Sequence, residues 1–250
     1  MLLPLVLPAI LCWGSAGGAS LSEVYAREVR QRYEVPPAER ARYAAELSRA
    51  LPNPDRPQYV VLVDRSPYIQ ALLLFWFSPD RAFEFIGASP VSTGKPGRFD
   101  YFYTPLGVFE HTVANLDFRA LGTKNELGIR GYGLAGMRVF DFGWQTSVQG
   151  WGKHREGTMR LQMHATDPAN LEKRLGTAQS KGCIRIPATL NVFFDRYGIL
   201  DADYEAALAE GKTFWVLPKD RAPTPWSGRY LVIVDTQRTA RPAWAKVIGR

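Results

Sequence analysis

Cysteine is scarce in this 250-residue chain, which contains only Cys12 and Cys183. Two cysteines are too few for a disulfide-rich scaffold, or for a zinc site built from four cysteines. Long hydrophobic runs are also scarce: beyond the N-terminal segment, the apolar stretch 71–77 is long enough only for a buried strand. With 46% apolar and 22% charged residues, the chain has the composition of a soluble globular protein.

Charge is absent from residues 1–19, which read MLLPLVLPAILCWGSAGGA. The apolar run ends in small residues, with Gly17 and Ala19 three positions and one position before a signal-peptidase cut. The run is shorter than the ~20 residues that a bilayer-spanning helix needs. We therefore expect residues 1–19 to be an export signal, with a single membrane anchor as the alternative. Cleavage leaves Cys183 as the only thiol of an exported protein.

The formal charge of +7 is concentrated near the C-terminus. Residues 20–57 carry seven basic and six acidic groups, residues 58–218 carry 17 and 16, and residues 219–250 carry seven and two. A nearly neutral central region does not indicate nucleic-acid binding. We expect the basic C-terminal extension, 219–250, to contact an anionic wall or membrane surface.

Hydrophobic periodicity predicts a mainly β protein with peripheral helices. A helical, proline-punctuated lead-in at 20–57 precedes a domain at 58–218, in which short strands alternate with tight turns. The predicted strands are 59–63, 69–77, 82–86, 158–164, 184–186, 212–217 and 230–234. The predicted helices are 21–33, 38–51, 187–197 and 202–210, with a further short helix starting at Pro168 after an Asp167 cap.

Two motif matches in the glycine-rich middle of the chain are set aside. Gly131-Tyr-Gly-Leu-Ala-Gly136 fits the dinucleotide-binding glycine pattern, but no buried strand precedes it and no helix follows it. Ser92-Thr-Gly-Lys95 spells the motif of penicillin-binding serine enzymes, but the glycines and proline around it exclude the helix that such a serine begins.

A histidine and a cysteine converge in the predicted topology. Residues 158–164 alternate strictly, so this strand places His164 on its polar face at its end. The loop that follows can return the chain to the same strand end, where it delivers Ser180-Lys-Gly-Cys183. A histidine within hydrogen-bond reach of a thiol removes its proton and stabilises the thiolate, so we predict that Cys183 is a nucleophile for acyl transfer.

The residues around Cys183 are also suited to stabilising an oxyanion and to binding substrate, which acyl transfer requires. Gly182 removes side-chain bulk where a carbonyl must approach, and the backbone N–H groups of Lys181, Gly182 and Cys183 are candidates for an oxyanion hole. Arg185 lies two residues after Cys183, on the same strand face, where it can hold a substrate carboxylate. We assign Ser180 and Arg185 to substrate binding.

His164 is followed, after fifteen residues, by Ser180-x-Gly-Cys183-x-Arg185. This pattern resembles the signature of the YkuD-type L,D-transpeptidases, which are cysteine enzymes of bacterial cell-wall peptidoglycan. Two upstream pieces match in order. They are Val-x-Thr-Gly at 91–94 and Thr-Pro-Leu-Gly-Val-Phe at 104–109. The resemblance covers about residues 58–217.

The resemblance implies a YkuD-like β-sandwich with Cys183 as the acylated nucleophile, His164 as the base and the carbonyl of Ala165 orienting the histidine ring. Such enzymes attack the bond before the terminal D-alanine of a tetrapeptide stem, hold the stem as a thioester and pass it to an amine. The resemblance also implies stem peptides as partners, no cofactor, a location in the periplasm or cell envelope, and sensitivity to carbapenems. Some relatives hydrolyse instead, so carboxypeptidase or amidase-like cleavage is the alternative.

The chain departs from the family pattern at two positions. Ala165 stands where glycine is common, which matters little if only its carbonyl is used. Lys181 stands where a second histidine is common, placing a cation next to the nucleophile in sequence. A non-catalytic wall-binding module also remains open. We expect no metal site, because His111 and His154 lack the close-spaced partners that zinc ligands have.

Overall fold

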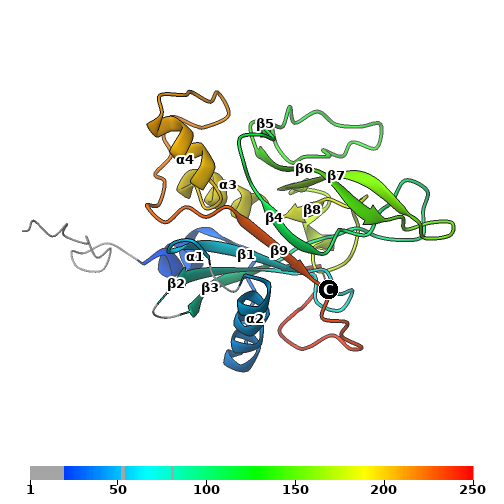
Figure 1. Cartoon of the computed structure of the whole chain (residues 1–250). Helices are drawn as coiled ribbons and strands as arrows, with labels where there is room; N and C mark the ends of the chain where they lie inside the picture. The colour runs from blue at the N-terminus through cyan, green and yellow to red at the C-terminus, as the bar shows by residue number, and fades with distance from the viewer. Residues whose placement is uncertain (1–19, 52–53, 80–81, 250) are drawn as a thin grey trace, which may run out of the picture.

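The computed structural model describes residues 20–51, 54–79 and 82–249, and it consists mainly of two sheets with helices packed around them (Figure 1). The helical elements are α1 (Leu21–Glu28), α2 (Pro37–Ala50), the 3-10 helix η1 (Glu172–Arg174), α3 (Ala188–Tyr197) and α4 (Ala202–Ala209). The strands are β1 (Gln58–Asp64), β2 (Ala71–Ser78), β3 (Ala82–Pro90), β4 (Gly107–Glu110), β5 (Phe118–Arg119), β6 (Arg138–Val148), β7 (Glu156–Ala165), β8 (Ile184–Ile186) and β9 (Tyr230–Val234). The mainly β prediction is confirmed; the export signal lies outside the described residues.

The first sheet has the strand order β3-β2-β1-β9-β4, with β1 and β9 parallel and the other neighbours antiparallel. Every residue of β1 is buried, because both faces of this sheet are covered. Val61 and Val63 face the main core, which the second sheet, α1 and α3 complete. Val60 and Leu62 face a second core, formed with α2 and the C-terminal segment. The run of apolar residues in the sequence reflects this two-sided burial.

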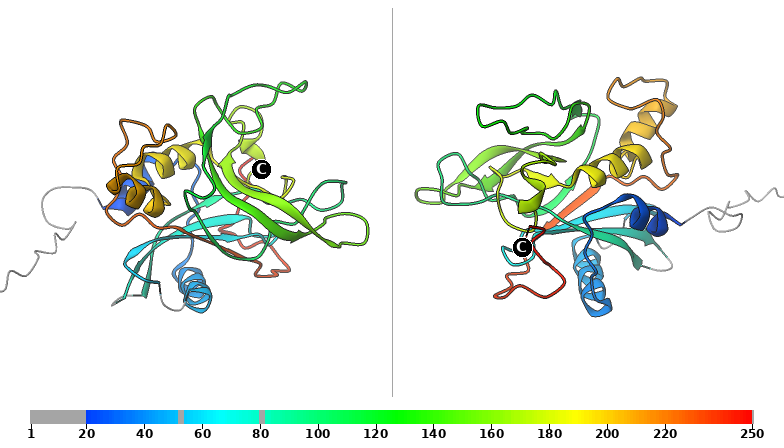
Figure 2. Two further views of the ribbon diagram at one scale, coloured as in Figure 1. Left: turned by 45° about the horizontal axis from the view of Figure 1, so that its top comes forward. Right: turned by 180° about the vertical axis from the view of Figure 1, so that it is seen from behind.

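The second sheet has the order β5-β6-β7-β8 and carries the predicted cysteine and histidine. The antiparallel hairpin of β6 and β7 is its largest part, and both views of Figure 2 show this hairpin projecting from the body. β8 pairs with β7 in parallel over three residues. Parallel neighbours need a crossover connection, which residues 166–183 provide.

The crossover is held by Asp167 rather than by the α-helix expected there. Its buried carboxylate accepts hydrogen bonds from the backbone N–H groups of Ala169 and Asn170, at 3.0 and 3.2 Å. Asp167 also accepts from the N–H of Arg130 at 2.9 Å, so the crossover is tied to the loop before β6. Only η1 is helical in this segment.

Two further predicted elements differ from the structure. The first helix ends at Glu28, because Val29 is extended and buried and the chain then runs along β3, with Tyr33 N–H donating to Ala88 O at 2.9 Å. No strand forms at 212–217. In this segment Val216 is buried, Trp215 is exposed, and the ring of Phe214 lies edge-on to that of Tyr204, with the centroids 4.8 Å apart.

The segment predicted as a C-terminal extension belongs to the body of the protein. Its strand, β9, lies between β1 and β4 in the first sheet. Three of its arginines form ion pairs with residues outside the segment: Arg221 with Asp201 and Glu205, Arg229 with Asp55, and Arg238 with Glu39. Contact with an anionic surface stays a prediction. None of the helices in the described ranges has the length and apolarity needed to cross a bilayer.

Candidate active site

The register of β7 and β8 brings the predicted site residues together. His164 lies opposite Arg185, and Met163 lies opposite Ile184. Paired residues of neighbouring strands share a face, and every second residue of a strand returns to that face. Cys183 directly precedes β8, two residues before Arg185, and its Sγ faces the carbonyl of Arg160 on β7.

His164 is held as a neutral base. Its side chain is almost fully buried, and Nδ1 lies 2.8 Å from the carbonyl oxygen of Ala165. Because a carbonyl only accepts, Nδ1 carries the hydrogen and Nε2 keeps its lone pair. Burial lowers the pKa of His164 to about 4, so the ring is uncharged at neutral pH.

Cys183 is a half-buried free thiol. Its Sγ lies 3.8 Å from the carbonyl oxygen of Arg160. Burial raises the pKa of the thiol, although the guanidinium of Arg185 acts in the opposite direction. The sequence led us to expect a thiolate stabilised by histidine, whereas here burial favours a protonated thiol and an unprotonated imidazole.

The turn before Cys183 is braced from inside by Ser180. The Ser180 side chain is 1% exposed, and its hydroxyl donates to the carbonyl of Cys183 at 2.5 Å while accepting from the N–H of Gly182 at 3.0 Å. Ser180 was predicted to bind substrate, but it is buried and both bonds lie within the turn. The N–H of Gly182, one of the three expected oxyanion donors, is committed to this bond. Those of Lys181 and Cys183 are the remaining candidates.

Gly182 is required at its position for two reasons. Its φ of +136° is one that residues with a side chain rarely adopt. A Cβ atom there would lie 2.6 Å from the sulfur of Met159 on β7. The glycine therefore lets the chain turn inward directly before Cys183.

Lys181 does not place its charge at the thiol. Its side chain is 61% exposed, and its ammonium pairs with the carboxylate of Asp100 at 2.7 Å. The ammonium also lies 5.8 Å from the ring centroid of Tyr101. Lys181 thus forms an outward ion pair on the rim of the turn.

Arg185 is half-buried and lies opposite His164, two residues after Cys183. Its Nε atom is buried, with no hydrogen-bond partner among the described residues. A buried guanidinium nitrogen without a partner is costly, and a carboxylate satisfies it with a charge-assisted bond. Arg185 is therefore placed to bind an anionic group next to Cys183.

Sequence reasoning missed Tyr132, whose ring lies edge-on to that of His164, with the centroids 4.6 Å apart. Its hydroxyl lies 3.3 Å from the side-chain oxygen of Gln162, and the amide nitrogen of Gln162 donates to the buried carboxylate of Asp141 at 2.9 Å. This chain of polar contacts fixes one wall of the site. The sequence feature that could have pointed to Tyr132 is its position between Gly131 and Gly133, in the glycine motif that does not fit dinucleotide binding. Gly133 has a positive φ and packs against Ala165.

The other histidines lie apart from this site. His111 is fully buried between Asp117 and the carbonyl of Leu200, and His154 is exposed on the β6–β7 hairpin, with Nδ1 3.0 Å from the carbonyl of Gln149. In the part of the chain that the structure describes, no three of the histidines, cysteines and acidic residues form a group able to hold a metal ion.

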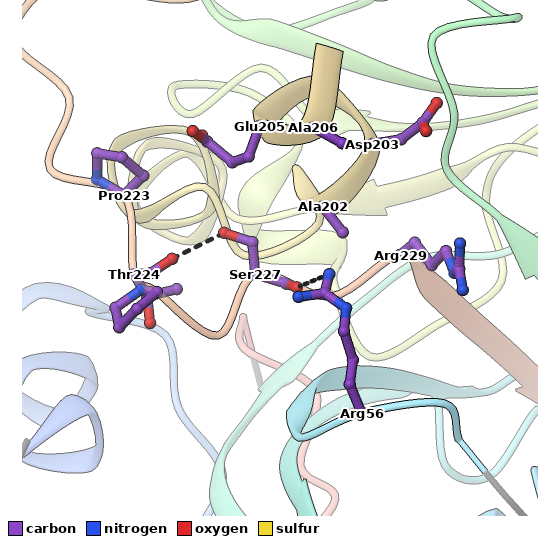
Figure 3. Close-up of a pocket in the computed structure, with 10 residues that line it drawn as sticks. Arg56, Ala202, Asp203, Glu205, Ala206, Pro223, Thr224, Ser227 and Arg229 are labelled. Atoms are coloured by element: carbon purple, nitrogen blue, oxygen red, sulfur yellow. Dashed lines mark hydrogen bonds between the residues drawn. The ribbon is translucent and has the colours of Figure 1, made fainter. Parts of the chain in front are cut away.

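Two cavities flank these elements. One, of about 400 Å³, is lined by residues 118–123 and 131–133, so Tyr132 separates it from His164. The other, of about 670 Å³, lies between α4 and residues 223–229, with Arg56, Asp203 and Arg229 in its wall (Figure 3). None of the predicted site residues lines the larger cavity.

Comparison with known proteins found weak similarity to solved structures. No family model and no curated protein matches the chain. One weakly similar structure is a fused Zn-dependent amidase/peptidase/peptidoglycan-binding domain-containing protein from Clostridium acetobutylicum, with 14% identity and a TM-score of 0.33. Another is a mutant of the helical cell shape determining protein Pgp2 from Campylobacter jejuni, with 13% identity and a TM-score of 0.31.

The matches cover 83% and 86% of this chain but only 66% and 61% of those two proteins. Scores this low do not establish a common fold. The evidence on function therefore comes from the residues of the candidate site.

Proposed function

We propose that this protein is a cysteine acyltransferase of bacterial peptidoglycan, an L,D-transpeptidase of the YkuD type. The observation that carries the proposal is the strand register that sets His164 opposite Arg185, two residues after Cys183, whose Sγ faces β7 at Arg160. An imidazole base beside a thiol supplies nucleophilic catalysis. The guanidinium, with its buried and unpartnered Nε, supplies the carboxylate site that a peptide with a terminal D-alanine needs.

In the acylation step, Sγ of Cys183 attacks the carbonyl carbon of the bond before the terminal D-alanine. A new S–C bond forms while the thiol proton moves to Nε2 of His164. The N–H groups of Lys181 and Cys183 stabilise the oxyanion. When the intermediate collapses, the C–N bond breaks and the departing amine takes the proton from His164, leaving a thioester and a neutral imidazole.

In the transfer step, an acceptor amine attacks the thioester carbonyl. His164 accepts the proton of that amine, a new amide bond forms and the S–C bond breaks. The thiolate of Cys183 then takes the proton back from His164. Water attacking in place of the amine gives hydrolysis through the same thioester, so the fate of the stem depends on which nucleophile enters.

Digestion of purified muropeptides by the wild-type protein and by Cys183→Ala, followed by mass spectrometry, tests the proposal. We expect cross-linked or D-amino-acid-exchanged products from the wild type alone. Shortened stems without such products would identify a hydrolase of the same chemistry. Equal activity of the Cys183→Ala variant would end the proposal.

A carbapenem adduct tests the nucleophile without a substrate. We expect one added carbapenem mass on the wild-type protein and none on Cys183→Ala. A wild-type protein that forms no adduct, although a small alkylating reagent modifies Cys183, would favour a non-catalytic wall-binding module.

A further inference from the structure

Along the edge of β7 that leads to Cys183, no strand of the described chain lies beside residues 156–162. β7 begins at Glu156, whereas β8 pairs with it only over residues 163–165. Among the described residues, no strand or isolated bridge pairs with 156–162 on the side away from β6. The hairpin therefore reaches well past the short β8 (Figure 2).

The backbone groups on this edge can be assigned from contacts near Cys183. The carbonyl of Arg160 faces Sγ of Cys183, and the N–H of Thr166 donates to the carbonyl of Ile186, the last residue of β8, at 3.1 Å. In a strand, the N–H and C=O of one residue point to the same side and those of the next residue point to the other. The N–H and C=O groups of Thr158, two residues before Arg160, therefore point outward too.

The protein's own chain leaves the line of β8 just before it would cover this edge. At Gly182 the chain turns inward against Met159, and Ser180 then forms a parallel bridge with Gly94. The space ahead of Cys183, next to Thr158 and Arg160, thus continues the line of β8 without being filled by another strand of the described chain. An unpaired strand edge is a ready template for an extended peptide.

We propose that the donor peptide binds as an added strand on residues 156–161 of β7, so that its scissile carbonyl meets Sγ of Cys183. Arg185 fixes the direction: it lies opposite His164, toward the C-terminal end of β7. A peptide whose terminal carboxylate reaches Arg185 therefore runs parallel to β7. Main-chain hydrogen bonds with Thr158 and Arg160 hold the residues before the scissile bond. The inference rests on the proposed function for the identity of that peptide.

Thr158→Pro tests the added strand directly. Proline removes the outward N–H but leaves the bonds to β6 in place, and proline is tolerated where the N–H of an edge residue faces outward. The matched control is Thr146→Pro. Thr146 lies opposite Thr158 on β6, and its N–H points to the other edge, because the carbonyl of Val148 accepts from Tyr103 there.

We expect Thr158→Pro to lower kcat/KM for a stem tetrapeptide by about 3- to 10-fold, which corresponds to one lost hydrogen bond. Thr146→Pro should stay near the wild-type value, and both variants should react with iodoacetamide at the wild-type rate. Equal kcat/KM for the two proline variants would overturn the inference. A wild type that never acylates Cys183 would instead overturn the proposed function.

Amide hydrogen exchange provides a second measurement if Thr158→Pro does not fold. In Cys183→Ala, a bound stem tetrapeptide should slow exchange at Thr158 and Arg160, which point outward, more than at Thr146. No such protection at saturating peptide would also overturn the added strand.

Discussion

Burial moves the pKa values of Cys183 and His164 in opposite directions. It raises the pKa of the thiol and lowers that of the imidazole to about 4. Each shift favours the uncharged form of its group. At neutral pH both groups therefore rest uncharged, and in the proposed mechanism the thiolate arises when the thiol proton moves to Nε2 of His164 during attack.

The pH profile of acylation follows from these shifts. His164 works as a base only when unprotonated, so the rate of acylation should fall as pH drops through about 4 and stay level from there toward neutrality. Alkylation by iodoacetamide needs the thiolate, so its rate should keep rising above the usual pKa of a free thiol. Stopped-flow measurement of acylation checks the fall in rate below about pH 4, and mass-spectrometric measurement of alkylation checks the rise in rate at high pH. A rate limb near pH 6.5 would contradict the assignment of a buried, neutral base.

Arg185 should control recognition of the donor carboxylate. Loss of a charge-assisted hydrogen bond costs about 1.5–3 kcal/mol, so Arg185→Gln should lower kcat/KM for a carboxylate-terminated stem by roughly 10- to 100-fold. The control is the same stem with a terminal carboxamide, for which wild type and variant should differ much less. An equal loss with both donors would mean that Arg185 acts by another route, such as raising the pKa of Cys183 when its charge is removed.

At the scale of elements, a buried ion network joins the second sheet to α3 and α4. The guanidinium of Arg138, on β6, is fully buried and pairs with Asp117, Asp195 and Asp201 at 2.6, 3.4 and 2.8 Å. Asp195 belongs to α3 and Asp201 directly precedes α4. Breaking a buried pair on one side leaves an uncompensated charge, so this network fixes the two helices against the sheet that carries the site.

His111 is a charged member of the same network. Its Nε2 lies 2.8 Å from a carboxylate oxygen of Asp117, and its Nδ1 lies 2.9 Å from the carbonyl of Leu200. Both partners only accept, so both ring nitrogens carry hydrogen. Burial alone would lower the pKa of His111, but the nearby Asp117 carboxylate and its hydrogen bond outweigh burial and raise it.

This imidazolium makes folding stability depend on pH. Because the folded pKa lies above the unfolded value of about 6.5, its stabilisation is complete below that pH and is lost as pH rises through the folded pKa. We expect the free energy of unfolding, measured in urea, to decline with rising pH in the wild type. The decline should be smaller in His111→Gln. Identical pH dependence in both proteins would show that His111 is neutral in the fold.

At the scale of the whole molecule, strands from early and late in the chain lie side by side in the first sheet. β9 runs parallel to β1 and antiparallel to β4, so it supplies the centre of the first sheet. Trp244, farther along the same segment, packs edge-on against Tyr33 and Tyr43 beside α2. The C-terminal segment therefore contributes to both cores.

Removal of residues 219–250 should abolish cooperative folding. The deletion separates β1 from β4 and exposes the apolar faces of both. Thermal unfolding followed by circular dichroism checks this, with a chain lacking only residues 1–19 as the control. A sharp transition in the shorter chain would contradict the central role of β9.

Elements with strong local patterns were predictable. The alternation at 158–164, the apolar run at 59–63 and the helix at 187–197 correspond to β7, β1 and α3. The failures have a common cause. Residues 29–33 and 212–217 resemble a helix and a strand locally, but in the fold Val29 and Val216 are buried outside those structures, against segments distant in sequence.

Some residues of the candidate site could likewise be predicted from the sequence, and others could not. Cys183, His164 and Arg185 could be proposed from residue type and spacing, because a thiol, an imidazole and a guanidinium can be identified directly in the sequence. Tyr132, Gln162 and Asp141 did not, since their contact with the site depends on how a distant loop and β6 fold against β7.

The sequence by itself determined which reactive groups are available and where the strongly patterned elements such as β1, β7 and α3 lie, because side-chain identity and short-range periodicity are local properties. Only the tertiary structure decided that the thiol and imidazole rest uncharged, that Ser180 and the N–H of Gly182 are committed to the turn, and that β9 lies inside a sheet. Burial, hydrogen-bond partners and strand neighbours depend on residues far apart in the chain, so they cannot be predicted from local sequence patterns.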